Sequence, residues 1–321
     1  MKDHRLMLFS GNANPELSRR IAAEVGVELS PIRVGRFPEG EVSVRIEEPV
    51  RGADVFVLQG TSPPANDNLM ELLVMTDALK RASAGRITAV LPFYGYGRQD
   101  RKDRPRVPIT AKLVANLIVA SGADRILTVD LHAPQIQGFF DIPADHLYAA
   151  PVFIRHFKEV FSPEFIENLV VVSPDVGGIK IAKHFAKHLR RSLAIVDKHR
   201  VGDRRTEVHN VIGEVNGHDI LLSDDLVSTG TSLASAIRLL KEKGARNISV
   251  AVTHAVLAGE AVDTLLASPV DTIWVTDTIP LHPAARDSDR FRVVSVAGML
   301  GSAIQRIHDD TPISILFDHH E

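Results

Sequence analysis

Residues 219–232 read DILLSDDLVSTGTS, and this stretch decides the fold class that we predict. An apolar run over 219–223 leads into two acids, then into small hydroxyl residues around a glycine, and then into a helical pattern over 232–243. A buried strand that passes through a short polar loop into a helix is the basic step of an α/β fold. We therefore expect a strand, a loop and a helix in that order.

The same alternation extends along the rest of the chain. Nearly continuous apolar runs, rather than alternating ones, are typical of parallel strands that are buried on both faces. The predicted strands are residues 54–59, 87–92, 125–130, 169–173, 193–196, 219–223, 248–253 and 272–276. Helical patterns over 68–82, 110–121, 177–189 and 232–243 lie between them. This order predicts an α/β protein with mostly parallel sheets flanked by helices.

A strand–loop–helix–strand unit occurs twice, once around Gly85 and once around Gly244, with an offset of 244 − 85 = 159 residues, about half of 321. We infer two similar α/β domains that meet near residues 148–151, although any two α/β units share this outline. Gly85, Gly122 and Gly244 each follow a predicted helix, where glycine commonly adopts the left-handed conformation.

The loop at 224–232 has the composition of a site for a phosphorylated sugar. Backbone N–H groups at a helix N-terminus and the hydroxyls of residues 228–232 can surround a phosphate, and Gly230 permits close approach. Asp224 and Asp225 can then hold vicinal hydroxyls of a sugar, or Mg²⁺ bound to them. The alternative is a capped helix with two surface acids. The corresponding loop inside the first unit, residues 60–67, lacks this composition.

Composition excludes several functional classes. Lys plus Arg is 37 and Asp plus Glu is 40, so the net charge of −3 argues against non-specific nucleic-acid binding. The chain has no cysteine, which excludes disulfides, zinc–thiolate sites, iron–sulfur clusters and thiol catalysis. No apolar run reaches the roughly 18 residues needed to span a bilayer, and residues 1–10 lack a signal-peptide layout. We expect a cytoplasmic protein with no nucleic-acid or membrane partner.

Two further segments carry polar chemistry. Residues 37–41, FPEGE, form a predicted turn with one aromatic and two acidic side chains. Residues 98–106, RQDRKDRPR, contain five basic residues in nine positions. A basic loop at a strand end suits a polyphosphate, although a solvated charged loop is an equally simple interpretation.

Taken together, these motifs resemble the ribose-phosphate pyrophosphokinase family, also called phosphoribosyl pyrophosphate synthetases. The loop at 224–232 alone resembles the phosphoribosyl-binding signature of type I phosphoribosyltransferases. The wider resemblance covers essentially the whole chain in the right order. Matching stretches are residues 11–13, 34–37, 66–72, 98–101, 107–112, 129–133, 135–140, 172–175, 197–200, 277–280 and 295–300.

The resemblance implies two type I phosphoribosyltransferase-like domains: residues 1–149 on the ATP side, and residues 150–300 on the ribose 5-phosphate side. Residues 301–321 would pack back on the first domain. It also implies transfer of the β,γ-diphosphoryl group of ATP to the 1-hydroxyl of ribose 5-phosphate. The products would be AMP and phosphoribosyl pyrophosphate, which feeds nucleotide, histidine and tryptophan biosynthesis. Mg²⁺ would accompany ATP, and the assembly would be a homo-oligomer, typically a hexamer built from dimers with the ATP pocket between subunits.

Site residues follow from the resemblance in the same way. Phe37 would stack on adenine, and the other nucleotide contacts would be Glu39, Gly40, Glu41, Arg98, Gln99, Asp100 and His132. His132 and Asp175 would hold Mg²⁺, with Asp130 nearby. Ribose 5-phosphate would bind Arg200, Asp224, Asp225, Ser228, Thr229, Gly230, Thr231 and Ser232. Lys198 and Arg200 would be catalytic, on a mobile loop over the reacting phosphates.

The chemistry of diphosphoryl transfer fits two of these roles. Displacement at phosphorus requires charge stabilisation and in-line positioning rather than covalent help. Lys198 and Arg200 are two residues apart, so an extended backbone points both cations the same way, and the polar segment 201–207 suits a lid that excludes water. Without the resemblance, Lys-His-Arg is ordinary surface charge. His132 without it is equally a structural histidine, since Mg²⁺ prefers oxygen ligands.

Three positions and one loop length depart from the family pattern. Residue 39 is Glu where Asp is common, residue 228 is Ser where many members have Asp, and residue 231 is Thr where they have Gly. The loss of an acid and the added side chain affect the ribose loop, so sugar affinity or metal dependence can differ. The basic loop after Asp100 is one residue shorter than in regulated members, which puts regulation by phosphate and ADP in doubt.

Two rival functions remain at this point. A plain phosphoribosyltransferase would need neither the 37–41 turn nor Lys198. A non-catalytic regulatory paralogue would be compatible with the substitutions at 228 and 231, but the presence of Lys198, Arg200, His132 and Asp175 argues against it.

Overall fold

The computed structural model describes residues 4–201 and 206–316, without the side chains of residues 198–201 and 206–209. The chain divides into two compact units, which we describe separately. Unit 1 consists of residues 1–148, 278–280 and 296–321, and unit 2 consists of residues 149–277 and 281–295.

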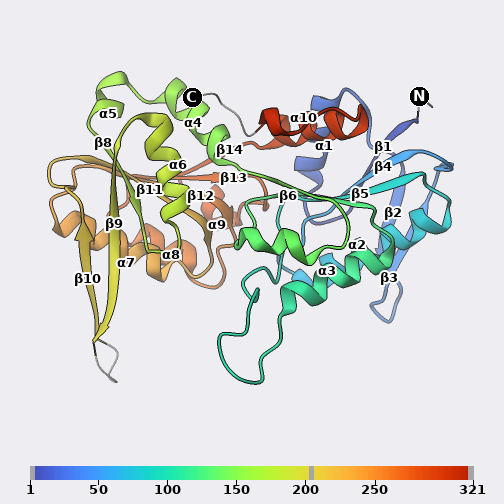
Figure 1. Cartoon of the computed structure of the whole chain (residues 1–321), viewed down its shortest axis with the longest axis horizontal. Helices are drawn as coiled ribbons and strands as arrows, with labels where there is room; N and C mark the ends of the chain where they lie inside the picture. The colour runs from blue at the N-terminus through green and yellow to red at the C-terminus, as the bar shows by residue number, and fades with distance from the viewer. Residues whose placement is uncertain (1–3, 202–205, 317–321) are drawn as a thin grey trace. The chain divides into compact units, whose positions relative to one another are not determined.

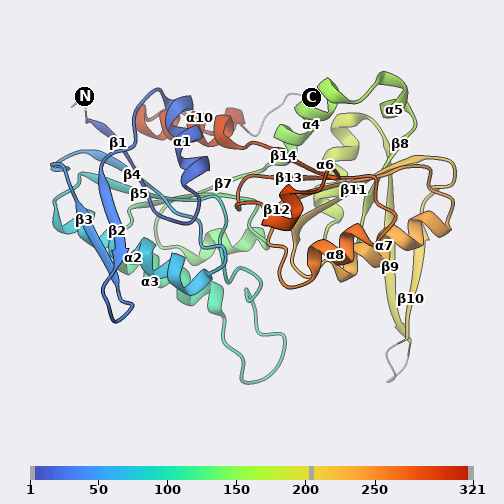
Figure 2. The same ribbon diagram turned by 180° about the vertical axis from the view of Figure 1, so that it is seen from behind.

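Unit 1 is built on a five-stranded sheet of described residues in the order β1-β4-β5-β6-β7, with every neighbouring pair parallel. Its strands are β1 (Leu6–Ser10), β4 (Asp54–Leu58), β5 (Arg86–Leu91), β6 (Arg125–Val129) and β7 (Ala144–Leu147). Helices α1 (Pro15–Val25) and α10 (Ala297–His308) cover one face, and α2 (Ala65–Arg81) and α3 (Thr110–Ser121) cover the other (Figures 1 and 2). Strands β2 (Ile32–Arg36) and β3 (Val42–Ile46) form a separate antiparallel hairpin.

Unit 2 contains a seven-stranded sheet of described residues in the order β10-β9-β8-β11-β12-β13-β14, in which only β10 runs antiparallel to its neighbour. The strands are β8 (Leu169–Ser173), β9 (Ser192–Val201), β10 (Thr206–Ile212), β11 (Asp219–Val227), β12 (Ile248–Ala255), β13 (Thr272–Thr276) and β14 (Phe291–Val294). Helices α4 (Ala150–Val160) and α6 (Ile179–Leu189) lie on one face, with α7 (Thr231–Glu242) and α8 (Ala261–Leu266) on the other (Figures 1 and 2). The remaining short helices are α5 (Pro163–Glu167), α9 (Pro283–Arg286), η1 (Pro134–Phe139) and η2 (Ser314–Leu316).

Burial explains why the continuous apolar runs form central strands. Every residue of β4, β8 and β12 is buried, so these strands have helices on both sides of the sheet. Each unit has its own apolar core: one forms around Val55, Leu72 and Ile118, and the other around Val172, Leu222 and Ile237. The prediction of α/β domains with parallel sheets is confirmed.

The two halves of the chain repeat one order of elements, but each half contributes its last helix to the other unit. In both halves the order is a strand, a helix, a hairpin and a strand, followed by alternating helices and strands. The first half ends in α4 and the second half ends in α10. Helix α4 belongs to unit 2, where it contacts α6, and α10 belongs to unit 1, where it contacts α1. The final helix of each half therefore packs on the first helix of the other half.

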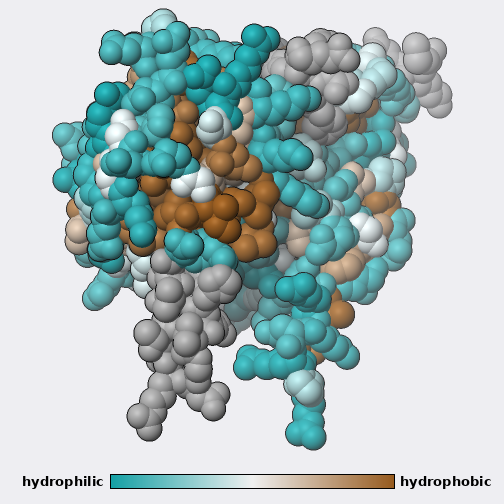
Figure 3. Space-filling model, turned by 60° about the vertical axis from the view of Figure 1, so that its left-hand side comes forward, coloured by the Kyte–Doolittle hydropathy of each residue, from teal (hydrophilic) through white to brown (hydrophobic). Residues whose placement is uncertain are grey.

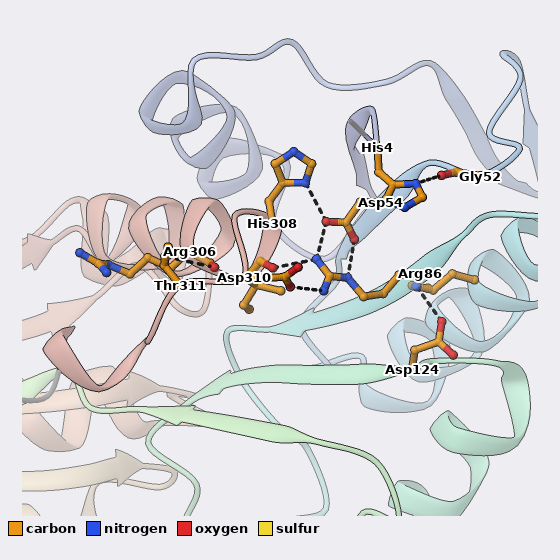
Figure 4. Close-up of polar contacts among 11 residues, drawn as sticks. His4, Gly52, Asp54, Arg86, Asp124, Arg306, His308, Asp310 and Thr311 are labelled. Carbon is orange, nitrogen blue, oxygen red and sulfur yellow. Dashed lines mark hydrogen bonds and ion pairs between the residues drawn. The ribbon is translucent and has the colours of Figure 1, made fainter. Parts of the chain in front are cut away.

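A buried acid fixes the end of α10 in unit 1 (Figure 4). Asp54 at the start of β4 accepts hydrogen bonds from Arg86 Nε at 2.8 Å and Nη2 at 2.6 Å, and its Oδ2 lies 2.8 Å from His308 Nδ1. Arg86 Nη2 also donates to the carbonyl of Ile307 at 2.7 Å. A guanidinium at the helix C-terminus satisfies a carbonyl that the helix leaves unpaired.

The same acid–arginine pair recurs in unit 2. Asp219 begins β11, has a fully buried side chain, and accepts hydrogen bonds from Arg246, Asn247 and Asn168. Burial raises the pKa of Asp219, but the hydrogen bonds from these donors outweigh it and hold the pKa below the ordinary value of 3.8. The repeat predicted from the glycine spacing is thus also present in the polar contacts at the strand starts.

Several sequence expectations need correction. Strand β11 extends to Val227 and β12 to Ala255, because the two strands stay paired beyond residues 223 and 253. Gly122 and Gly244 have positive φ, as expected, but at the end of α2 Ser83 takes that conformation (φ 67°) and Gly85 does not. Gly85 is required for a different reason, since a Cβ there would lie 2.8 Å from the carbonyl oxygen of Gly52.

None of the described helices is both long enough and apolar enough to cross a membrane.

Candidate functional site

Asp224 and Asp225 lie at the carboxyl end of the sheet in unit 2. They are part of β11 rather than of a loop after it, and Asp224 pairs with Val252 in the ladder to β12. The backbone N–H of Asp225 donates to Asp224 Oδ1 at 2.9 Å. Strand β11 therefore places both carboxylates at the edge where parallel sheets bind ligands.

The hydroxyl loop turns from β11 into α7 at Gly230. Gly230 has a φ of +75° and directly precedes the helix, and a Cβ there would lie 3.1 Å from both the Ala261 carbonyl oxygen and Leu265 Cγ. The loop is also tied to the end of β12, because Ala258 N donates to the Ser228 carbonyl at 2.9 Å. The side chains of Thr229, Thr231 and Ser232 are exposed beside the N–H groups of the first turn of α7. This arrangement can bind a phosphate.

Three carboxylates interact in unit 2. Burial raises the pKa of Asp224 well above its ordinary value of 3.8, and the negative charges of Asp225 and Asp175 raise it further. A proton or a cation at Asp224 relieves this repulsion. The site is therefore electrostatically prepared for a hydroxyl-bearing or cationic ligand.

Asp175 lies in the short loop between β8 and α6. Its Oδ1 accepts the N–H of Gly178 at 3.0 Å, and its backbone carbonyl accepts the hydroxyl of Ser173 at 2.7 Å. Ser173 has no role predicted from the sequence. The only sequence feature that pointed to Ser173 was its position, as a small hydroxyl residue before Pro174 at the end of a buried strand.

Lys198 and Arg200 lie in strand β9, where the sequence predicted a loop. Their backbones pair with His209 and Glu207 of β10, and alternate residues of a strand share one face. Their side chains lie outside the described part of the structure, as do residues 202–205 of the predicted lid 201–207.

In unit 1 the predicted nucleotide turn connects β2 to β3. Phe37 N donates to the Glu41 carbonyl at 2.8 Å, and Gly40 N donates to the Phe37 carbonyl at 2.9 Å. Gly40 needs its positive φ of 97° for this turn. The Phe37 side chain is 50% exposed, and Glu39 and Glu41 are exposed beside it. An exposed aromatic ring at a rigid turn can stack on a planar base.

The basic loop between β5 and α3 is anchored at its beginning. The backbone carbonyl of Gln99 accepts a hydrogen bond from the N–H of Ala111 at 3.1 Å. The side chain of Gln99 is hydrogen-bonded to the hydroxyl of Thr110. Gln135 Nε2 donates to Asp100 Oδ2 at 2.7 Å, a contact that the sequence did not indicate. The Arg98 side chain is exposed. These contacts fix residues 99–100 while Arg98 stays accessible.

Asp130 and His132 follow β6, also in unit 1. Asp130 is buried with a φ of 37°, and His132 is exposed. The segment is held by the N–H of Leu131, which donates to His146 Nε2 at 2.9 Å. Burial, with a smaller contribution from the charge of Asp130, raises the pKa of Tyr148. His146 and Tyr148 were not singled out from the sequence.

The structure thus brings Asp175, Asp224, Asp225 and the hydroxyl loop together within unit 2. The 37–41 turn, residues 98–100 and residues 130–132 belong to unit 1. Among the described residues there is no group of three or more His, Cys, Asp or Glu side chains that could hold a metal ion.

Comparison with known proteins gives consistent results. Residues 6–122 match the model of the N-terminal domain of ribose phosphate pyrophosphokinase, and residues 200–318 match that of the phosphoribosyl synthetase-associated domain. A ribose-phosphate pyrophosphokinase of Neisseria meningitidis is 51% identical over 314 residues, which are 98% of this chain and 95% of that protein. The one from Thermosipho africanus is 49% identical and covers 98% of both chains.

Among solved structures, the phosphoribosylpyrophosphate synthetase from Mycobacterium smegmatis is similar with a TM-score of 0.89 and 42% identity. The match covers 95% of this chain and 99% of that one.

Proposed function

The chain belongs to the ribose-phosphate pyrophosphokinase family, and we propose that it transfers the diphosphoryl group of MgATP to the 1-hydroxyl of ribose 5-phosphate. The match over nearly the full length of relatives at about 50% identity carries this proposal. The exposed hydroxyl loop after Asp224 and Asp225 supports it, because a phosphate and vicinal hydroxyls are the groups of ribose 5-phosphate that need binding.

In the proposed reaction the 1-hydroxyl oxygen attacks the β-phosphorus and loses its proton. The bond between the β-phosphorus and the oxygen that bridges it to the α-phosphorus breaks, and AMP leaves. Lys198 and Arg200 stabilise the charge that develops on the transferred group. Arg200, Asp224, Asp225 and residues Ser228, Thr229, Gly230, Thr231 and Ser232 hold the sugar phosphate.

The ATP side of the proposal rests on unit 1. Phe37 stacks on adenine, and the turn residues Glu39, Gly40 and Glu41 bind the nucleotide. The phosphate side is bound by Arg98, Gln99, Asp100 and His132, with Asp130 nearby.

Mg²⁺ fits the donor set in part. Mg²⁺ prefers oxygen ligands and usually retains several waters, binding one or two carboxylates plus substrate phosphates. Asp175, beside Asp224 in unit 2, offers such a carboxylate, and a third or fourth protein ligand is not needed. His132 offers nitrogen and is the weaker candidate. Bound Mg²⁺ would neutralise phosphate charge and orient the polyphosphate.

We further propose a cytoplasmic homo-oligomer, a hexamer built from dimers. Apolar side chains gather on the face shown in Figure 3. Exposed apolar patches are typical of protein–protein contacts. Light scattering coupled to size-exclusion chromatography measures the assembly.

The test is AMP formation by the full chain with ATP, ribose 5-phosphate and Mg²⁺. We expect AMP only when ribose 5-phosphate is present, and a loss of about 100-fold or more in kcat for Lys198→Ala, because a charge-stabilising donor is removed. Lys183→Ala, which removes an exposed lysine of α6, is the matched control and should keep full activity. A well-folded oligomer that forms no AMP would instead favour the regulatory paralogue, with Ser228 and Thr231 as the explanation.

A further inference from the structure

The loop from β8 to α6 holds Asp175 at two points. The Ser173 hydroxyl donates to the Asp175 backbone carbonyl at 2.7 Å, and the Gly178 N–H donates to the carboxylate Oδ1 at 3.0 Å. Oδ2 takes no hydrogen bond from the described residues. One contact fixes the backbone and the other fixes the side chain, so one carboxylate oxygen remains available to a ligand.

The Ser173 hydroxyl donates its hydrogen bond from a buried position. Ser173 is the last residue of β8, pairs with Ile195 of β9, and is 0% exposed. Removal of a buried donor leaves its acceptor without a partner. The backbone of Asp175 therefore depends on this one hydroxyl.

Gly178 leaves the space that the hydroxyl occupies. A Cβ at Gly178 would lie 2.9 Å from Ser173 Oγ, 3.6 Å from Pro174 Cδ and 3.8 Å from Asp224 Oδ1. Only the serine hydroxyl would have to move, because the other two separations are ordinary van der Waals contacts. A side chain at 178 would thus rotate the hydroxyl away from the Asp175 carbonyl.

We propose that Ser173 is a positioning residue for the reaction: its hydroxyl fixes the Asp175 loop so that Asp175 Oδ2 faces the divalent cation of the substrate nucleotide. This inference rests on the proposed function, in which Asp175 binds that cation. Gly178 also contributes to this positioning, because it has no side chain that would displace the Ser173 hydroxyl.

The test compares Ser173→Ala with a matched control. Ser268→Ala removes another buried serine of unit 2, whose hydroxyl donates to the Leu265 carbonyl at 2.6 Å at the end of α8. Mn²⁺ binding is measured from the loss of the free-ion signal in electron paramagnetic resonance. We expect Ser173→Ala to weaken Mn²⁺ binding about 10-fold, because residues that orient metal ligands have effects of this size. Ser268→Ala should leave Mn²⁺ binding unchanged.

The activity assay supplies a second readout. Ser173→Ala should require about 10-fold more free Mg²⁺ for half-maximal AMP formation, with kcat at saturating Mg²⁺ largely retained. Gly178→Ala should show the same shift, and Ser173→Ala/Gly178→Ala should show less than the product of the two single effects, because both act through one hydrogen bond.

The two arms separate the two hypotheses. Wild-type protein that forms no AMP contradicts the proposed function, whereas the Mn²⁺ arm judges Ser173 without turnover. The inference is overturned if wild type binds no Mn²⁺, or if Ser173→Ala binds Mn²⁺ like Ser268→Ala. It is also overturned if the effects of Ser173→Ala and Gly178→Ala multiply independently.

Discussion

The loops that follow β4 in unit 1 and β11 in unit 2 differ in where their hydroxyls point. After β4, Thr61 and Ser62 are buried, and Thr61 Oγ1 accepts the N–H of Gly95 at 2.6 Å. After β11, Thr229 and Thr231 are exposed at the start of α7. Both loops connect a buried strand to a helix. We call the loop after β4, with buried hydroxyls, the inward loop, and the loop after β11, with exposed hydroxyls, the outward loop.

The difference separates a structural use of hydroxyl groups from a binding use. In the inward loop the Thr61 hydroxyl and the Ser62 carbonyl bond to groups of the same unit, and both side chains are buried. The outward loop leaves hydroxyls and helix N–H groups accessible, which a phosphate requires. A repeated fold therefore does not repeat a site, because the site depends on side chains at one turn.

The acid–arginine pairs differ as well. Arg86 is 29% exposed and holds the end of α10, whereas Arg246 is 53% exposed and has no such helix among its described contacts. The pair in unit 1 therefore supports tertiary packing, and the pair in unit 2 supports the strand starts locally.

The largest expected effect comes from Asp54→Asn. The substitution leaves Arg86 and His308 without their carboxylate in a mostly buried place, and we expect a loss of about 3 kcal/mol in the free energy of unfolding. Asp219→Asn should cost about 1 to 2 kcal/mol, because exposed Arg246 can return to water. Urea denaturation measures both. Equal losses would remove the distinction between the pairs, and faster amide exchange in α10 should appear only for Asp54→Asn.

Gly95→Ala should destabilise the inward loop by about 2 to 3 kcal/mol. An added Cβ would overlap the backbone carbonyl oxygen of Thr61, which cannot rotate away as a side chain can. Gly138→Ala is the matched control in unit 1, since a Cβ there meets nothing within 4 Å. Thermal unfolding of the two variants checks the prediction, and a Gly95→Ala protein as stable as Gly138→Ala would contradict the tight closure of this loop.

A pair of isosteric substitutions tests the inward and outward loops directly. Thr61→Val leaves the buried Gly95 N–H unpaired and should cost about 1 to 2 kcal/mol in stability. Thr229→Val should change stability by less than about 0.5 kcal/mol because the side chain is exposed, yet raise KM for ribose 5-phosphate severalfold. Urea denaturation and steady-state kinetics give the two values. If Thr229→Val leaves KM unchanged, its hydroxyl does not contact the sugar phosphate.

The smallest effect is a dependence on pH in unit 2. The folded-state pKa of Asp219 lies below 3.8, its ordinary value, so its contribution to stability is complete above pH 3.8 and is lost as the pH falls through the folded-state pKa. We expect wild type and Asp219→Asn to approach each other in stability below about pH 4. Urea midpoints between pH 3 and pH 7 measure this, and a gap that stays constant would contradict the lowered pKa.

Much of the fold could be predicted from the sequence because its central strands are buried on both faces. The runs at 169–173 and 272–276 match β8 and β13 residue for residue, and 110–121 matches α3. Strands β1, β7, β10 and β14 at the sheet edges and the hairpin strands β2 and β3 were not predicted. Most of them contain partly exposed residues that break the apolar pattern. The sequences of α4 and α10 do not show that each helix packs in the unit of the other half. An apolar helix face indicates burial but not which helix will contact it.

For the site, composition around Gly230 indicated a phosphate loop, and the structure adds that pairing with β12 carries Asp224 and Asp225 within the strand. The sequence could not indicate the hydrogen bonds that Ser173 and Gln135 make. Both bonds depend on how the folded chain places the two partners, and neither belongs to a recognisable sequence motif. The roles of His132, Lys198 and Arg200 came from the family resemblance and remain predictions.

The position of α10 in unit 1 has a consequence for synthesis on the ribosome. Unit 1 contains residues 1–148 but also needs the helix that ends at His308, 308 − 148 = 160 residues later. At about 5 to 20 residues per second, the amino-terminal sheet waits roughly 8 to 32 s for its last helix. During that interval the side of α1 that contacts α10 lacks its partner. A nascent chain stalled in the second half should therefore engage holdase chaperones through its first half.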